Sequence, residues 1–223
     1  MIKEKKTGQL IIISGPSGSG KGTLVSKLLN KNRWLSISTT SRKIRTNDIE
    51  GETYNFVSVQ EFEKLIKEDY FLEYTKYAGN YYGTPKSKIK EKLEEGKDVF
   101  LEIEIEGAAN IKKQVPEAIF IFIMPPSLKE LVKRLKKRNT DTNDKIIERF
   151  KTAYKEINEV TKYNYVVVND KVDKALEKIE AILKAEKCRV DRIEDIYLDT
   201  KEEEIHELLL DNDFINENIS EKI

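Results

Sequence analysis

The chain has 223 residues, of which 39% are hydrophobic, so it is long enough and apolar enough to fold as one packed domain. No apolar run approaches the length that spans a bilayer, and the apolar run near the N-terminus is too short for a secretion signal, which excludes membrane-spanning and secreted classes. The only cysteine, Cys188, has no partner for an internal disulfide. We therefore expect a cytoplasmic protein.

The formal charges balance at 40 basic and 40 acidic residues, but their distribution along the chain is uneven. The segment from Glu186 to Ile223 holds 13 acids and 5 bases, so the part before it is basic. A basic body suits a polyanionic ligand, and a nucleotide, a nucleic acid or an acidic protein would each satisfy that pattern.

Arginine is rare, with eight residues among the 40 bases, so its positions are informative. The planar guanidinium grips a phosphate with two hydrogen bonds, whereas lysine offers a point charge. Five arginines form two groups that therefore predict phosphate binding: Arg42 and Arg45, then Arg134, Arg138 and Arg149.

The expected elements, in chain order, alternate between strands and helices. Residues 9–14 form a short β-branched run that leads into a glycine-rich loop and then into helical spacing. Further strands are predicted at 98–105, 118–124 and 165–169, and helices at 85–95, 127–137, 143–161 and 171–187. This alternation predicts an α/β fold with a parallel sheet and helices on both of its faces.

Two segments break the alternation. Residues 36–84 contain six of the ten tyrosines, and their runs at 54–59 and 71–83 predict short antiparallel strands in a small separate sheet. We assign Tyr70, Tyr74 and Tyr77 to the core of that sheet in preference to stacking on RNA bases. Residues 134–150 are basic, with a break at 138–143, and are typical of a mobile flap.

The acidic segment 189–223 carries no strand signal. Its one amphipathic stretch, 202–210, predicts a short helix, and we expect the end of the chain to be frayed.

The stretch GPSGSGKGT fits the phosphate-loop pattern G-x-x-x-x-G-K-S/T at every position but the last, where glycine replaces the hydroxyl that touches magnesium. Backbone N–H groups of such a loop surround phosphate oxygens, the next helix adds its positive end, and the lysine adds a full charge. Mg²⁺ keeps several waters, so losing one hydroxyl does not forbid it. The ATP-binding residues predicted here are Gly15, Pro16, Ser17, Gly18, Ser19, Gly20, Lys21, Gly22 and Thr23.

The strand predicted at 98–105 places Glu102 and Glu104 two residues apart, so both would point to one face at its carboxyl end. Ligands bind at that end of an open parallel sheet. Glu102 is a candidate to hold Mg²⁺ through water, as an acidic residue of a second strand does in phosphate-loop enzymes. The alternative is that one or both carboxylates face solvent.

Several motifs together resemble the guanylate kinase family, in order and at family spacing from residue 9 to about 185. They are GPSGSGKGT (15–23), STTSRKIR (38–45), GETYNF (51–56), FLEY (71–74), GNYYGT (79–84), LEIEIEG (101–107), PPS (125–127), RLKKRNTD (134–141) and VVND (167–170). The resemblance implies a P-loop nucleoside-triphosphate-hydrolase-like parallel sheet with an inserted GMP-binding domain and a helical lid. It implies a core at 1–35 and 95–188, an insertion at 36–94 and a lid at 135–158; the acidic tail, 189–223, has no counterpart in the family pattern.

The resemblance also implies an activity, which is Mg²⁺-dependent transfer of the ATP γ-phosphoryl group to GMP and dGMP. Matching the family's GMP site assigns Arg42, Arg45, Tyr54 and Tyr82 to the acceptor phosphate and Ser38, Glu73 and Thr84 to guanine. Glu104 is also assigned to GMP binding. Arg134, Arg138 and Arg149 match arginines of the lid and donor phosphates, and Asn169 matches an adenine contact. Lys21, Arg42, Arg138 and Arg149 are the expected catalytic residues.

The guanine assignment also agrees with hydrogen-bonding chemistry. A carboxylate such as Glu73 can accept both adjacent donors of the guanine edge, and a hydroxyl such as Ser38 can donate to its carbonyl oxygen. No general base is needed, because a phosphate nucleophile is already largely ionised at neutral pH.

The chain departs from the family pattern at Ser41, Ile44, Asn47, Asp48 and Asn139, and none of these changes removes a phosphate-binding side chain. Two alternatives remain: an inactive guanylate-kinase-like protein-interaction module, and a kinase for another nucleoside monophosphate. We expect ATP and GMP as small-molecule partners, no nucleic-acid or membrane partner, and a monomer or a homodimer.

Overall fold

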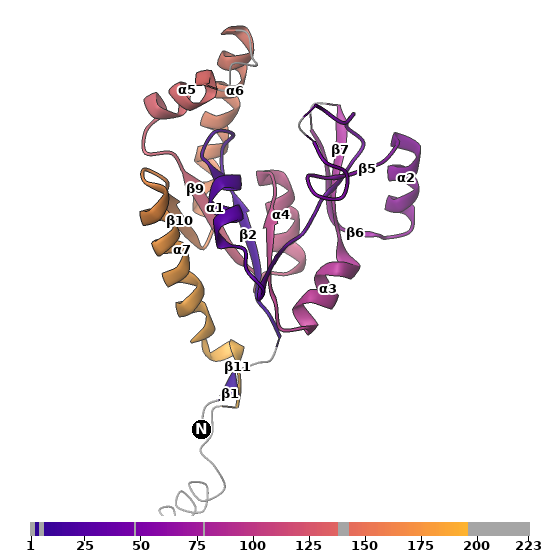
Figure 1. Ribbon diagram of the computed structural model, residues 1–223, viewed down its shortest axis with the longest axis vertical. Helices are drawn as coiled ribbons and strands as arrows, with labels where there is room; N and C mark the ends of the chain where they lie inside the picture. The colour runs from indigo at the N-terminus through magenta and orange to yellow at the C-terminus, as the bar shows by residue number, and fades with distance from the viewer. Residues whose placement is uncertain (1–2, 5–6, 47, 78, 138–142, 196–223) are drawn as a thin grey trace, which may run out of the picture. The chain divides into compact units, whose positions relative to one another are not determined.

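The computed structural model describes residues 3–4, 7–46, 48–77, 79–137 and 143–195 (Figure 1). The chain divides into two compact units, residues 6–181 and a unit formed by residues 1–5 with 182–223. The larger unit contains a five-stranded sheet in which every neighbouring pair is parallel, as the sequence predicted. Its strands, in spatial order, are β10 (Tyr165–Val168), β9 (Ile119–Met124), β2 (Leu10–Ser14), β8 (Asp98–Glu102) and β3 (Arg33–Leu35).

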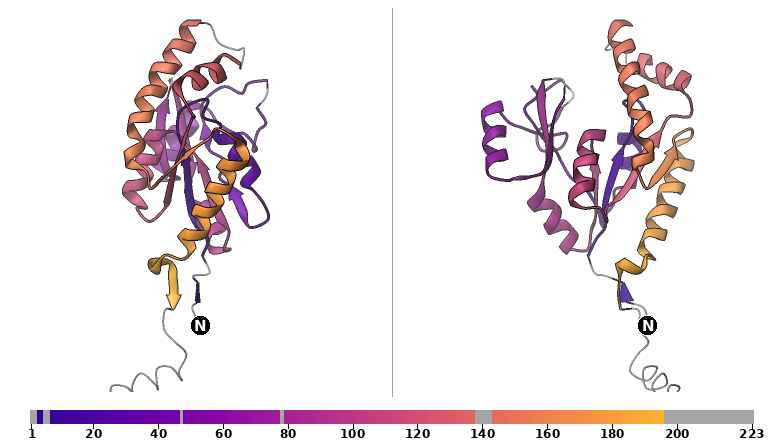
Figure 2. Two further views of the ribbon diagram at one scale, coloured as in Figure 1. Left: turned by 90° about the vertical axis from the view of Figure 1, so that its left-hand side faces the viewer. Right: turned by 180° about the vertical axis from the view of Figure 1, so that it is seen from behind.

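Helices cover both faces of this sheet, because successive crossover connections run toward opposite edges of it (Figures 1 and 2). The chain leaves β2 through α1 (Lys21–Leu28) and reaches β3 beyond β8, whereas it leaves β8 through α4 (Ile105–Gln114) and reaches β9 beyond β2. Right-handed crossovers in opposite directions place α1 and α4 on opposite faces. The ends of β2 and β8 lie where the crossovers change direction, the place where open parallel sheets bind ligands.

The central strands are buried on both faces, which explains their unbroken apolar runs. In β2, Ile11, Ile12 and Ile13 have no exposed surface. One face packs Ile12, Leu101 and Phe120 against Ile89 of α3 (Lys86–Glu94) and Ile111 of α4. Although α3 falls within the range assigned to the insertion, it therefore packs on the central sheet. The domain boundaries themselves stay a prediction.

The predicted small sheet is present, with four strands in the order β5 (Asn55–Phe56), β4 (Thr39–Thr40), β7 (Asn80–Pro85) and β6 (Phe71–Tyr77). The β6–β7 and β4–β7 pairs are antiparallel, but β5 pairs with β4 in parallel, so the expectation of antiparallel pairing is wrong for β5. The strand predicted at 54–59 also stops early. Ser58 caps a helix, α2 (Val59–Lys67), by accepting a hydrogen bond from the Glu61 N–H.

Phenylalanines form the aromatic core of this small sheet. The Phe62 ring stacks on the Phe71 ring at 4.5 Å between centroids, and on the Tyr81 ring at 5.1 Å. Tyr70, Tyr74 and Tyr77, which the sequence assigned to this core, are exposed by 36%, 46% and 48%. That assignment is wrong, because Tyr70 precedes β6, Tyr77 ends it, and Tyr74 lies on β6 itself, which is an edge strand of the sheet.

Two helices follow β9 in the larger unit and lie side by side: α5 (Leu128–Lys137) and α6 (Asn143–Ile157), the latter continued by a 3₁₀ turn at Asn158–Lys162 (Figures 1 and 2). Leu131 and Leu135 of α5 pack with Ala153 of α6. Arg138 and the rest of 138–142, part of the predicted lid, lie outside the described residues.

The last α-helix in the described part of the chain, α7, spans Val172–Lys187. In the smaller unit a 3₁₀ turn at Val190–Arg192 leads into β11 (Ile193–Asp195), which pairs antiparallel with β1 (Lys3–Glu4), so the expectation of no strand beyond residue 188 is wrong there. The amphipathic stretch 202–210 lies outside the described residues. Among the helices that the structure describes, none combines the length and apolarity needed to cross a membrane.

Candidate functional site

The glycine-rich loop joins β2 to α1, as the sequence predicted. It leaves the sheet after Ser14, and α1 begins at Lys21. Gly20 has φ of +92°, and a Cβ there would lie 2.4 Å from Nδ2 of Asn169, so this turn accepts only glycine. The loop therefore directs its backbone N–H groups and the N-terminus of α1 toward one place, which is the arrangement that binds phosphate.

Two cationic side chains meet at this loop. The Lys21 ammonium donates to the carbonyl oxygens of Gly15, at 2.5 Å, and Pro16, at 3.3 Å. Arg149, in α6, donates from a guanidinium nitrogen to the Ser17 hydroxyl at 2.6 Å. The structure thus brings together two predicted catalytic residues that are far apart in the sequence.

A carboxylate that the sequence did not single out also reaches the loop. Glu156 lies seven residues after Arg149, so both side chains project from the same face of α6. Burial and the nearby charge of Glu104 raise the pKa of Glu156, while the charge of Lys21 and a hydrogen bond from the Ser17 N–H oppose that rise. The helical spacing from Arg149 was the signal that could have identified Glu156.

Glu102 and Glu104 do not share a strand, so that part of the prediction is wrong. Strand β8 ends at Glu102, and Glu104 is the residue that precedes α4. Glu102 faces the glycine loop, because a Cβ on Gly22 would lie 3.4 Å from one of its carboxylate oxygens. Among the described residues, no group of three or more His, Cys, Asp or Glu side chains is arranged to hold a metal ion.

A pocket of about 340 Å³ lies between the small sheet and the carboxyl end of β8. Most of the residues assigned to GMP line it, and they are Ser38, Arg42, Arg45, Tyr54, Glu73, Tyr82 and Glu104. Glu102 lines it as well, so the pocket and the glycine loop share a border. Thr84 is fully buried and reaches the pocket through Glu73.

Glu73 is the buried acid of the pocket, with 7% of its surface exposed. Burial raises the pKa of its carboxyl to about 7. The hydrogen bond from Thr84 opposes this rise, and the charge of Glu106 makes a smaller contribution in the same direction as burial. The Thr84 hydroxyl donates to Oε1 at 2.6 Å. A Cβ on Gly107 of α4 would lie 2.8 Å from Oε2, so α4 approaches the carboxyl closely. These contacts hold the carboxyl in one orientation at the pocket wall.

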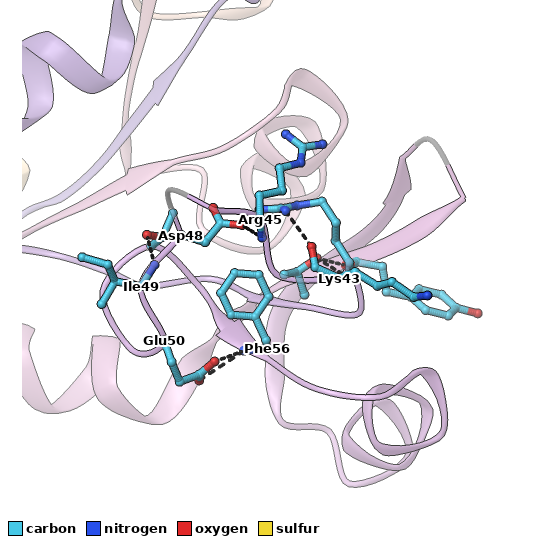
Figure 3. A network of polar contacts seen from close by, with 10 residues as sticks. Lys43, Arg45, Asp48, Ile49, Glu50 and Phe56 are labelled. Carbon is cyan, nitrogen blue, oxygen red and sulfur yellow. Dashed lines mark hydrogen bonds and ion pairs between the residues drawn. The ribbon is translucent and has the colours of Figure 1, made fainter. Parts of the chain in front are cut away.

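The other end of the pocket is organised around Asp48. Its Oδ2 atom accepts a hydrogen bond from the Arg42 guanidinium at 2.8 Å and from the Arg45 backbone N–H at 2.6 Å. The first contact raises the pKa of Arg42 and lowers the pKa of Asp48. The Arg42 guanidinium also lies over the rings of Tyr54, at 5.3 Å, and Phe56, at 5.4 Å. In Figure 3 the Arg45 side chain extends away from Asp48. Asp48 therefore orders the loop that carries both arginines, and the Arg45 guanidinium is directed away from Asp48.

Two predicted donor-side residues, Arg134 and Asn169, are also in contact. Arg134, in α5, donates to the backbone oxygen of Asn169 at 3.1 Å and to Glu130 at 3.1 Å. Asn169 is 4% exposed and lies beside the glycine loop. Arg138, assigned to catalysis by resemblance, is outside the described residues.

Comparison with known proteins finds relatives that cover most of this chain. The family model described as guanylate kinase matches residues 7–186. The guanylate kinase of Clostridium tetani is 59% identical over 205 residues, which cover 92% of this chain and 99% of that protein. The guanylate kinase of Caldanaerobacter subterraneus is 55% identical, with 90% and 98% covered. The crystal structure of guanylate kinase from Anaplasma phagocytophilum is similar with a TM-score of 0.73 at 30% identity, covering 96% of this chain and 99% of that one.

Proposed function

Since the chain belongs to the guanylate kinase family, we propose that it transfers the γ-phosphoryl group of ATP to GMP or dGMP, giving ADP and GDP or dGDP. The observation that carries this proposal is the pocket in which a buried carboxyl, Glu73, faces the same space as an arginine pair, Arg42 and Arg45. One end of the pocket suits a base with adjacent donors and the other suits a phosphate. The bordering glycine loop supplies the place for a second nucleotide.

Guanine recognition follows from the chemistry of Glu73 and Ser38. The ring N–H and the amino group of guanine would donate to the Glu73 carboxylate, and the Ser38 hydroxyl would donate to the guanine oxygen. Adenine would instead turn a lone pair toward the carboxylate. By analogy with paired base contacts, this difference is worth about 1 to 3 kcal/mol. Thr84 supports this selection, because its hydroxyl donates to Oε1 of Glu73 and keeps the carboxylate in a fixed orientation.

The reaction itself needs positioning and charge neutralisation. Arg42, Arg45, Tyr54 and Tyr82 would hold the GMP phosphate, one oxygen of which is the nucleophile. Its second pKa is about 6, so this oxygen is ionised at neutral pH without a general base. The oxygen would attack the γ-phosphorus in line, the bond to the β-bridging oxygen would break, and ADP would leave with that electron pair.

On the donor side, Lys21 and Arg149 are placed to offset the charge that builds up on the phosphates, because both already contact the loop. Arg134, Arg138 and Asn169 complete the proposed donor site. Closure of the helical segment 135–158 would exclude water that otherwise hydrolyses ATP.

Mg²⁺ is proposed to arrive with ATP. Glu102 fits this role, because its carboxylate faces Gly22 at the edge of the phosphate loop, and Mg²⁺ prefers oxygen ligands and retains several waters. Glu102 would hold the ion through one of those waters. The bound ion supplies positive charge to the β- and γ-phosphates.

The proposed setting is nucleotide metabolism in the cytoplasm, where the enzyme would return GMP to the guanine nucleotide pool. ATP and GMP are the proposed partners, without nucleic acid or membrane, and the enzyme would act as a monomer or a homodimer. Both ligands are polyanions, which agrees with the basic charge of the chain before Glu186.

A coupled assay of ADP release with GMP, dGMP, AMP, UMP and CMP as acceptors tests the proposed reaction. We expect turnover with GMP and dGMP, and an efficiency with AMP that is lower by about 5- to 150-fold, which corresponds to the difference of about 1 to 3 kcal/mol for paired base contacts. Equal rates with AMP would refute the guanine assignment. No turnover with any acceptor would instead favour the inactive interaction module.

A further inference from the structure

Asn169 connects three parts of the donor site. It is the residue that follows β10, and it is 4% exposed. Its side-chain Nδ2 donates to the backbone oxygen of Ser19 in the glycine loop at 2.8 Å, across 150 residues of sequence. Its backbone N–H donates to the oxygen of Met124, the last residue of β9, at 2.8 Å. Its backbone is therefore anchored to the sheet, and its side chain is directed at the loop.

The side-chain amide of Asn169 packs directly against the backbone of the glycine loop at Gly20. Gly20 turns with φ of +92°, and the space that its Cβ would occupy is filled by Nδ2 of Asn169. The Ser19 carbonyl oxygen that accepts the hydrogen bond comes directly before this turn. Asn169 thus fixes the direction of the peptide unit that leads into Lys21 and the first turn of α1.

The same residue also contacts the helix that carries Arg134. The Arg134 guanidinium donates to the Asn169 carbonyl oxygen at 3.1 Å, and Glu130, one turn earlier in α5, accepts from Arg134 at 3.1 Å. A continuous series of hydrogen bonds therefore runs from α5 through Asn169 to Ser19. One N–H of the Asn169 side-chain amide is thus committed to the loop, while the amide also carries a second N–H and an acceptor oxygen.

We propose that Asn169, besides its assigned contact with adenine, is a positioning residue of the phosphate loop and acts on ATP through the Ser19–Gly20 turn. This inference rests on the proposed ATP-dependent kinase reaction. It predicts that loss of the amide weakens the use of nucleoside triphosphate donors in general, including a donor that lacks the adenine amino group. A residue that only contacts adenine would affect only donors that carry this amino group.

The test compares two donors, ATP and purine riboside triphosphate, which lacks the 6-amino group. In Asn169→Asp, a carboxylate oxygen would face the Ser19 carbonyl oxygen, which replaces a hydrogen bond by repulsion. We expect kcat/KM to fall at least tenfold for both donors, with the KM for GMP unchanged within about twofold, because a buried hydrogen bond has been lost at the donor site alone.

Asn164→Ala is the matched control. Asn164 lies directly before β10 and uses its side-chain oxygen to accept from the Phe120 N–H at 3.0 Å, away from the loop. This variant also loses a hydrogen bond that ties β10 to β9, but it should keep both donor efficiencies. If it lost them equally, general loosening of the strand would explain the result and the proposal would fail.

Amide hydrogen exchange in the nucleotide-free protein gives a readout that does not depend on activity. Residues 15–21 should exchange faster in Asn169→Asp than in the parent and in Asn164→Ala. If Asn169→Asp does not fold, Asn169→Ser removes the amide without adding charge and undergoes the same measurements. Unchanged exchange, or a loss of kcat/KM that is confined to ATP, would overturn the proposal. A parent protein without GMP turnover would instead refute the proposed reaction, and the exchange comparison would still decide whether Asn169 orders the loop.

Discussion

The pH dependence of stability tests whether burial makes the ionised Glu73 carboxylate unfavourable in the folded protein. Burial is the main cause that raises the pKa of this carboxyl from 4.5 to about 7 in the folded protein. A group whose pKa is higher in the folded state contributes stability that is fully present below the unfolded value and is lost as the pH rises through the folded value. The protein without GMP should therefore lose stability between pH 4.5 and about 7, and the loss should persist above that range.

The magnitude follows from the size of the change. Since a pKa difference of one corresponds to about 1.4 kcal/mol, the ionised carboxyl costs the folded state about 3 kcal/mol near pH 8. Glu73→Gln keeps the shape and an oxygen that accepts from Thr84, but carries no charge. We expect this variant to be more stable than the parent by about 3 kcal/mol near pH 8, which raises Tm by roughly 6 to 12 °C for a chain of this length.

The same substitution should damage the proposed reaction, because the amide cannot accept both donors of guanine. Stability and GMP binding would then change in opposite directions, as is typical where function requires an unfavourable group. KM for GMP should rise about tenfold or more, while KM for ATP stays within about twofold, because only the base contact is altered.

The assay is urea unfolding followed by circular dichroism, near pH 5 and pH 8, without nucleotide. Glu68→Gln is the control, since it also removes one carboxylate but at an exposed position near Lys64. Its stability should follow that of the parent to within about 0.5 kcal/mol at both pH values. Our reasoning would be refuted if Glu73→Gln were less stable than the parent near pH 8, or if the difference between them were the same near pH 5.

The remaining predictions concern phosphates and magnesium. Arg42→Lys keeps the charge but loses the fork that can hold Asp48 and a phosphate together, so KM for GMP should rise about tenfold in steady-state assays; an equal rise for ATP would contradict this. Gly20→Ala would place a Cβ 2.4 Å from the Asn169 amide, so calorimetry should show ATP binding lost and GMP binding retained, and normal ATP binding would count against it. Mg²⁺ alone should bind weakly, because Gly22 offers no hydroxyl; tight binding by calorimetry without nucleotide would disprove this.

The parallel sheet and the phosphate loop could be predicted because their signals are local. A strand buried on both faces needs an unbroken apolar run, and Ile11, Ile12 and Ile13 provide it. The loop needs glycines at left-handed positions, and Gly20 is one of them. Neither inference depends on knowing which distant segment lies alongside.

The end of β8 could not be predicted, because it depends on a neighbouring strand. The alternation of isoleucine and glutamate continues through Glu104, so the pattern alone extends the strand. In the structure the last register pair joins Glu102 to Ile13, and β2 turns into the glycine loop two residues later. The Ile103 N–H still donates to the Ile13 oxygen at 3.3 Å, but no further register pair follows, and the chain begins α4 at Ile105.

The state of Glu73 also lay beyond the sequence, for a similar reason. Its residue type and its match to the guanine site could be read from the chain, but its burial results from Thr84 on β7 and Gly107 on α4. Asp48 is a second case. The sequence marks it as a departure from the family pattern, whereas the structure gives it two hydrogen bonds that order the arginine loop.

Three of the cations assigned to phosphate share one feature, which is that they donate hydrogen bonds to oxygen atoms of the protein itself. Lys21 contacts loop carbonyls, Arg42 contacts Asp48, and Arg149 contacts the Ser17 hydroxyl. These contacts avoid the cost of a half-buried charge without a partner and keep each side chain near the proposed substrates. A phosphate oxygen is a stronger acceptor than a carbonyl or a hydroxyl, so Lys21 and Arg149 can exchange partners with little rearrangement. Arg42 differs, because Asp48 already offsets its charge and both must be accommodated when a phosphate binds. The fork of the arginine makes this possible, since one nitrogen can keep Asp48 while the others turn to the phosphate.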